Sequence, residues 1–214
     1  MIAKGFESDG QEVPEQGQVA SLTSKNNFIN FCKSVKLPIT NGQQIQGGSC
    51  NPAPMGVIPS SDNMPSAKFT FPKNGETVQA NKQFTISMAI RGMEAGHFVN
   101  ADKNYFAAPQ QLSDKGQIVG HSHVVVEKLE SLDQTTPTNP KQFAFFKGLN
   151  GKPNGQNELT AVVMKGLPEG VYKLSSINTA SNHQPVLVPI AQHGSLDDAV
   201  YVGVFCICFR GLWS

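Results

Sequence analysis

The sequence feature that most constrains the fold is a regular series of short apolar stretches, separated by turn residues, across residues 67–204. In the clearest stretch, residues 83–90, every second residue from Phe84 to Ile90 is apolar. Alternation of this kind predicts a β-strand with one buried face. The pair Asn74-Gly75 is typical of a tight turn between strands. Expected strands lie at residues 67–71, 83–90, 116–129, 142–147, 158–164, 171–176 and 198–204.

One turn resembles a structural motif of β-sandwiches. Tyr172 follows Gly170 at the start of an expected strand, as in the tyrosine corner, where the phenol bonds to backbone a few residues upstream. Short strands at regular spacing also favour two packed sheets over a helical bundle. The 20 glycines and 14 prolines suit such a turn-rich chain. The sequence therefore predicts an all-β, immunoglobulin-like β-sandwich of about seven strands.

The residues outside this domain form three expected segments. Residues 1–23 are polar, acidic and without periodicity, so we expect them to be disordered or loosely attached. Residues 24–66 are expected to form a short helix, in which four apolar side chains recur at helical spacing, and a Pro-rich extended strap. Residues 205–214 form an apolar tail, which is either a last strand or a non-native extension. The sandwich itself is expected to span residues 67–204.

Charge and hydropathy exclude two classes of partner. The net charge is +1, from 17 basic and 16 acidic residues, and no basic cluster stands out. A nucleic-acid-binding surface normally carries a basic stripe, so we expect no nucleic-acid partner. No apolar run approaches the roughly 20 residues that span a bilayer, so we expect no membrane span. The first residues lack the apolar region of a signal peptide, so the chain is either intracellular or is shown here without its leader.

Two of the four cysteines bracket a polar loop. A bond between Cys32 and Cys50 would close a loop of about 19 residues and stabilise the fold by roughly 3 kcal/mol. Such a bond requires an oxidising compartment. The spacing of the four cysteines matches no zinc pattern, and Cys206 and Cys208 lie too close on one strand to bond easily to each other. We therefore expect a disulfide between Cys32 and Cys50.

Two histidines, one residue apart, precede a run of three valines in the stretch GQIVGHSHVVVEKL, residues 116–129. On a strand, His121 and His123 point to the same face. Neutral imidazoles so placed can chelate copper or zinc, with His183 or His193 as a third ligand. The alternative is a pair of hydrogen-bonded histidines within the sheet. The spacing of the pair also matches part of the first cupin motif, but no second cupin motif follows.

Residues 193–198 bring together a histidine, a serine and two aspartates. Adjacency in sequence is not the geometry of a catalytic triad, and no G-x-S-x-G elbow occurs anywhere in the chain. A turn capped by the Ser and Asp side chains is the better interpretation. The sequence therefore favours a protein without catalytic activity over an enzyme.

The long segment 91–115 carries the aromatic residues Phe98, Tyr105 and Phe106. Segments of that length usually bind something or cover something. Exposed aromatic rings on such a loop would stack on sugar rings. The alternative is that the rings fold inward and cover the sheet.

Long stretches of the chain resemble a known family. They include GHSHVVVE (residues 120–127), NHQPVLVP (residues 182–189) and QHGSLDD (residues 192–198). Across residues 25–204 the chain is similar to a family of fungal secreted proteins of unknown activity, which implies an extracellular location. The GHSH strand, the LPEGVYKL turn and NHQP also resemble bacterial exported immunoglobulin-like domains with a GHxH strand. That second similarity implies a sandwich and directs attention to His183 beside the histidine pair.

Two functional hypotheses follow. The first is a secreted, non-catalytic β-sandwich that binds a cell-wall polysaccharide, a host surface or another surface component. The second is a copper- or zinc-binding protein whose site contains His121 and His123, with His183 or His193.

Overall fold

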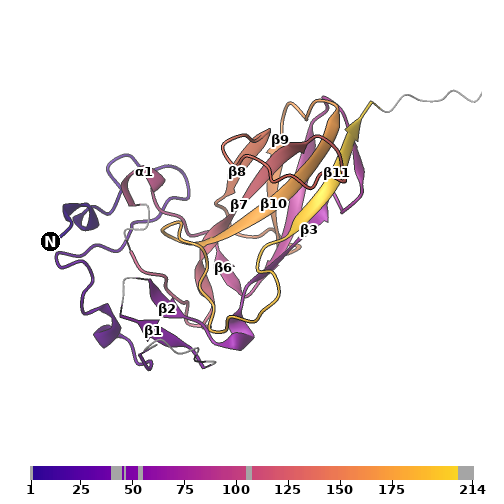
Figure 1. Ribbon diagram of the computed structural model, residues 1–214. Helices are drawn as coiled ribbons and strands as arrows, with labels where there is room; N and C mark the ends of the chain where they lie inside the picture. Colours follow the sequence, from indigo (N-terminus) through magenta and orange to yellow (C-terminus); the bar gives the residue numbers. More distant parts are fainter. Residues whose placement is uncertain (1, 40–44, 46, 53–54, 105–107, 207–214) are drawn as a thin grey trace, which may run out of the picture.

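The computed structural model describes residues 2–39, 45, 47–52, 55–104 and 108–206 (Figure 1). Within these residues the regular structure is almost entirely β. The helical elements have three or four residues each: η1 (Lys4–Glu7), η2 (Phe31–Ser34), η3 (Ser61–Asn63) and α1 (Ala101–Asn104). The prediction of an all-β protein is confirmed.

Most strands belong to two sheets. The larger sheet contains, in spatial order, β4 (Thr77–Gln79), β11 (Ala199–Phe205), β10 (Gly170–Ala180), β7 (Ile118–Leu129) and β6 (Met93–Ala95), and β8 (Phe145–Leu149) also pairs with β7. The smaller sheet contains β3 (Ser66–Phe71), β5 (Phe84–Arg91) and β9 (Glu158–Val163). A separate pair is formed by β1 (Ser49–Asn51) and β2 (Gly56–Ile58).

The inner faces of the two sheets share one hydrophobic core. Ile86 and Met88 of the smaller sheet lie in the same buried cluster as Val124, Val126 and Leu174 of the larger one. These side chains occupy alternate positions on their strands, as the pleat requires. The long central strands β7 and β10 pair over ten residues, so β7 is held rigidly from Gly120 to Leu129.

All seven expected strands are present, but four short strands were not predicted. Strands β1, β2, β4 and β6 have three residues each, too few for an alternating pattern to be visible. Strand β8 begins at Phe145 rather than at Gln142, because the amide of Gln142 donates to the carbonyl of Asn139 in a turn. Strand ends are set by such local turns, which the apolar pattern does not report.

The predicted helix at the start of residues 24–66 does not form. Asn27 and Phe28 have φ angles of 57° and 59°, which no right-handed helix contains. Only the single turn η2 remains, and Ser24 caps a tight turn by accepting from the amides of Asn26 and Phe28. The run of polar residues before Phe28 bonds to its own backbone more readily than it continues a helix.

The N-terminal residues bond to the rest of the chain. The amide of Val19 donates to the carbonyl of Phe98, and Asn104 Nδ2 donates to the carbonyl of Ser8. Element η1 lies beside α1 (Figure 1). A disulfide joins Cys32 to Cys50, with Cα atoms 5.6 Å apart. Of the apolar tail, Phe205 ends β11, while residues 207–214 lie outside the described residues.

Candidate metal centre

His121 and His123 lie on the outer face of the larger sheet. Val124 and Val126, which follow them on the strand, lie in the core, so the alternation of β7 directs both imidazoles to the other side. Their ring centroids are 4.7 Å apart. His121 is fully buried, whereas His123 is only partly covered. The predicted side-by-side placement of the two rings is present in the structure.

Gly120 permits the close packing of β7 and β10 beside His121. A Cβ atom at Gly120 would lie 2.0 Å from the carbonyl oxygen of Thr179, which is a backbone atom and cannot move freely. The Cα atoms of Thr179 and His121 are cross-strand partners in the same register. The glycine that precedes the first histidine therefore fixes how closely the neighbouring strand approaches the site.

His183 is the third member of the group. Its Nδ1 atom lies 3.1 Å from Nε2 of His121. The residue follows β10 in a tight turn and has a φ angle of 68°, a left-handed conformation that is uncommon outside glycine. Its amide donates to the carbonyl of Ala180, which holds the turn. One ring nitrogen from each of His121, His123 and His183 lies within 4.8 Å of the others.

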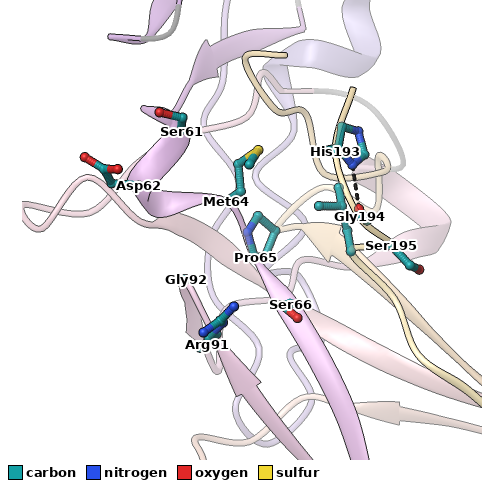
Figure 2. Close-up of a pocket in the computed structure, with 11 residues that line it drawn as sticks. Ser61, Asp62, Met64, Pro65, Ser66, Arg91, Gly92, His193, Gly194 and Ser195 are labelled. Atoms are coloured by element: carbon teal, nitrogen blue, oxygen red, sulfur yellow. Dashed lines mark hydrogen bonds between the residues drawn. The ribbon is translucent and has the colours of Figure 1, made fainter. Parts of the chain in front are cut away.

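His193, the alternative third ligand, does not join this group. It lines a separate cavity of about 370 Å³ with Asp62 and Arg91, and its Nδ1 donates to the carbonyl of Gly194 (Figure 2). Arg91 and His193 lie on different walls of that cavity (Figure 2). The structure thus separates the two histidines that sequence reasoning could not distinguish.

Each imidazole in the group directs one ring nitrogen at a backbone carbonyl. His121 Nδ1 lies 3.1 Å from the carbonyl oxygen of His97, and His183 Nε2 lies 2.8 Å from that of Val99. His123 makes a backbone hydrogen bond to Ile177. A carbonyl only accepts, so the nitrogen that faces it carries the proton. In a neutral ring the second nitrogen is then a lone pair.

The two remaining nitrogens, His121 Nε2 and His183 Nδ1, face each other 3.1 Å apart. Among the described residues, Thr179 Oγ1 also lies near His121 Nε2, at 3.3 Å. That oxygen is also 3.5 Å from Nδ1 and 3.4 Å from the carbonyl of the same histidine. All three separations exceed the usual length of a hydroxyl hydrogen bond. The hydroxyl is therefore a weak hydrogen-bond partner for this nitrogen.

His121 and His123 remain neutral well below physiological pH. Burial, together with repulsion from His123 and His183, lowers the pKa of His121 to about 3. Burial and repulsion from His183 lower the pKa of His123 to about 4. Neutral imidazole is the form that binds a metal ion. The alternative from the sequence, hydrogen-bonded histidines, corresponds to a neutral tautomer in which one of the two facing nitrogens of His121 and His183 carries the proton.

A cavity of about 240 Å³ adjoins the group. His123 and His183 form part of its lining, and His121 lies behind them, fully buried. N-terminal residues, among them Glu15 and Gln18, also line it. The imidazoles are therefore reached from this cavity rather than from bulk solvent.

The rim of the cavity comes from β8 and the turn after it. Phe146 lies with its ring centroid 5.3 Å from that of His123, and 45% of its surface is exposed. Asn150 lines the cavity next to it. Sequence reasoning missed both residues, since neither lies within twenty positions of a histidine in the chain.

The segment that was expected to carry sugar-stacking aromatics contributes one described ring. Phe98 is buried, and its centroid lies 6.0 Å from that of His121, so it covers the sheet. Tyr105 and Phe106 lie outside the described residues. The described part of the segment therefore agrees with the covering role.

Residues 193–198 form a capped turn. The carboxylate of Asp197 accepts from Ser176 Oγ and from the amide of Asn178, and Ser195 Oγ donates to the carbonyl of Asp197. Burial raises the pKa of the Asp197 carboxyl. None of these three hydrogen bonds involves His193, so the histidine, the serine and the aspartate do not form a triad. No described helix is long and apolar enough to cross a membrane.

Comparison with known proteins gives two matches. The model of the CLU5d N-terminal domain family matches residues 67–205. The protein named pathogenicity cluster 5 protein d, from Colletotrichum graminicola, is 43% identical over 198 residues, which are 92% of this chain and 41% of that protein. The chain thus spans about two fifths of the length of this relative. The predicted similarity to a fungal family of unknown activity is confirmed.

Proposed function

The chain belongs to the CLU5d N-terminal domain family, and we propose that it binds one Cu(II) or Zn(II) ion through His121, His123 and His183. The observation that carries this proposal is the convergence of one ring nitrogen from each of the three histidines, all within 4.8 Å of one another, with His121 Nε2 and His183 Nδ1 3.1 Å apart. Zn–N bonds of 2.0–2.1 Å at tetrahedral angles place two ligand nitrogens about 3.3 Å apart. The nitrogens of His121 and His183 are already close to that separation, and the ring of His123 would approach them when an ion binds.

The outer hydrogen bonds support the same proposal. Metal-binding histidines usually donate their other ring nitrogen to a carbonyl or carboxylate, which fixes the tautomer and the ring orientation. The carbonyls of His97 and Val99 supply this for two of the rings. A shared ion would bond to the second nitrogen of each ring.

Calorimetric titration of the metal-free protein with Cu(II) and with Zn(II) tests the proposal. We expect one ion per chain. We expect the affinity to fall more than about 100-fold in His121→Ala and in His123→Ala, because each removes a ligand. His193→Ala is the matched control and should bind as the wild type does. Equal affinity in the wild type and in the two ligand variants would contradict the proposal.

We also propose an extracellular location and a non-catalytic, surface-binding role. The disulfide between Cys32 and Cys50 supports an oxidising compartment. Two neighbouring phenylalanines, Phe143 and Phe146, are about half exposed with centroids 5.8 Å apart, and support contact with a surface polymer. Pull-down on insoluble chitin, β-glucan and host cell-wall material tests this role. Absence of retention on all three would contradict it.

Two finer structural predictions remain proposals. One is an immunoglobulin-like arrangement of the sandwich, which is supported by the hydrogen bond from Tyr172 Oη to the carbonyl of Pro168, 2.9 Å long. The other is the division into residues 1–23, 24–66, 67–204 and 205–214. Limited proteolysis would test the division, since cleavage should concentrate between these segments.

A further inference from the structure

We propose that the cavity beside the three histidines receives a neutral, hydroxyl-bearing ligand, one residue of a carbohydrate, with a hydroxyl oxygen on the metal ion. This inference rests on the proposed metal site. Three protein ligands leave a fourth tetrahedral position, as in catalytic and substrate-binding zinc sites. Since His123 and His183 line the cavity and His121 is fully buried behind them, that position faces the cavity.

The charged groups of the lining favour a neutral ligand. Of the residues that line the cavity, Glu15 alone has an acidic side chain, and no lysine or arginine is among them. A cationic ligand would be repelled by the divalent ion at the same site. An anionic ligand would be attracted by the ion, but it would meet the acidic side chain of Glu15 and no basic side chain to bind its remaining oxygens. An uncharged ligand avoids both repulsions.

The polar groups of the cavity match hydroxyl groups. Asn150 contributes a carboxamide, which offers both donors and an acceptor, as a hydroxyl does. The amide of Gln18 is instead used within the N-terminal segment, where its Nε2 donates to the carbonyl of Gly10 and its Oε1 accepts from the amide of Glu15. Gln18 therefore shapes the wall, and the carboxamide of Asn150 is the group that a ligand would meet.

The apolar side of the cavity fits the flat face of a sugar ring. The ring of Phe146 is 45% exposed and leans at 31° to that of His123. An aromatic ring of this kind packs against the C–H face of a pyranose while the hydroxyls at its edge reach polar groups. The cavity volume of about 240 Å³ lies below the range typical of drug-sized ligands, and suits a single sugar residue.

The test uses the full chain loaded with Zn(II) and neutral oligosaccharides of glucose and of N-acetylglucosamine as probes, followed by calorimetry. Inorganic phosphate and acetate are the anionic probes. We expect at least one neutral oligosaccharide to bind, and phosphate and acetate to bind at least tenfold more weakly. Binding of the anions with no binding of any oligosaccharide would overturn the proposal.

Three variants locate the ligand. Phe146→Ala and Asn150→Ala should weaken oligosaccharide binding at least tenfold, while Zn(II) affinity stays within twofold of the wild type because neither residue is a ligand. Tyr201→Ala is the matched control, because it removes a ring elsewhere on the larger sheet that is 43% exposed, against 45% for Phe146. This variant should bind Zn(II) and the oligosaccharide as the wild type does. Undiminished oligosaccharide binding in Phe146→Ala and Asn150→Ala would place the ligand elsewhere and overturn the proposal.

The contact with the metal has its own readout. In the Cu(II)-loaded protein, we expect the bound oligosaccharide to change the electron paramagnetic resonance spectrum, because a hydroxyl oxygen enters the coordination sphere. An unchanged spectrum under saturating oligosaccharide would overturn the metal contact. A wild type that binds the ion but no oligosaccharide would overturn this inference alone, whereas a wild type that binds no ion would overturn the proposed function as well.

Discussion

His121 and His183 meet at a distance of 3.1 Å, Nε2 to Nδ1, although 62 residues separate them in the chain. Each ring is held from behind by a backbone carbonyl, that of His97 for one and that of Val99 for the other. The contact is therefore set by three segments at once: β7, the turn after β10 and the residues before α1. The predictions below test what this arrangement does.

The third ligand is tested by His183→Asn. Asparagine tolerates the left-handed φ of 68° at this position, so the turn should survive while the imidazole is lost. We expect the affinity for Cu(II) and Zn(II) to fall more than about 100-fold, measured by calorimetry. Circular dichroism should show an unchanged fold. Retention of full affinity would mean that His183 does not bind the ion.

The stability of the metal-free protein should fall as the pH falls below about 6.5. The unfolded chain protonates His121 and His123 near pH 6.5, whereas their pKa values of about 3 and about 4 keep both neutral in the folded protein at pH 5. The unfolded state then binds more protons, so acid destabilises the fold. Between pH 7 and pH 5 we expect a loss of about 2 kcal/mol for each histidine.

Urea unfolding at a series of pH values measures this effect. In the double variant His121→Asn/His123→Asn the pH dependence of the free energy of unfolding should become shallower by the same amount. Glu127, with its lowered pKa, and Asp197, with its raised pKa, are present in both proteins and cancel in the comparison. Parallel pH profiles for the two proteins would show that these histidines are not neutral when buried.

Gly120→Ala should destabilise the protein by about 2–4 kcal/mol. The added methyl group would lie 2.0 Å from the carbonyl oxygen of Thr179, so β7 and β10 must separate next to His121. Gly155→Ala is the matched control, since a Cβ atom there meets nothing within 4 Å. Chemical denaturation compares the two. Similar stabilities would show that the strands adjust at no cost.

Removal of the disulfide should loosen the strap and leave the sandwich folded. Cys32 and Cys50 lie 18 positions apart, and a cross-link of this length is worth roughly 3 kcal/mol. In Cys32→Ala/Cys50→Ala we expect faster proteolysis within residues 24–58, detected by mass spectrometry, while residues 67–205 stay protected. Equal protection of the strap with and without the bond would show that other contacts hold it.

The sequence predicted the elements whose pattern is local. Alternation over residues 83–90 predicted β5, and the run of valines within residues 116–129 predicted β7. The geometry of a strand then placed His121 and His123 on one face. The position of Tyr172 after Gly170 predicted the hydrogen bond from its phenol to the backbone, because the donor Tyr172 Oη and the acceptor carbonyl of Pro168 are only four residues apart. The predicted helix after Ser24 failed for a local reason too, since polar side chains bonded to the backbone and turned the chain at Asn27 and Phe28.

The tertiary structure alone decided which histidine completes the site. The sequence offered His183 and His193 as equal candidates for the third ligand. A left-handed turn brings His183 to His121, whereas His193 lies in another cavity. The carbonyls of His97 and Val99, and the ring of Phe146, come from segments with no sequence signal for the site. Backbone periodicity fixes which face a side chain occupies, whereas contacts between distant segments depend on how the whole chain packs.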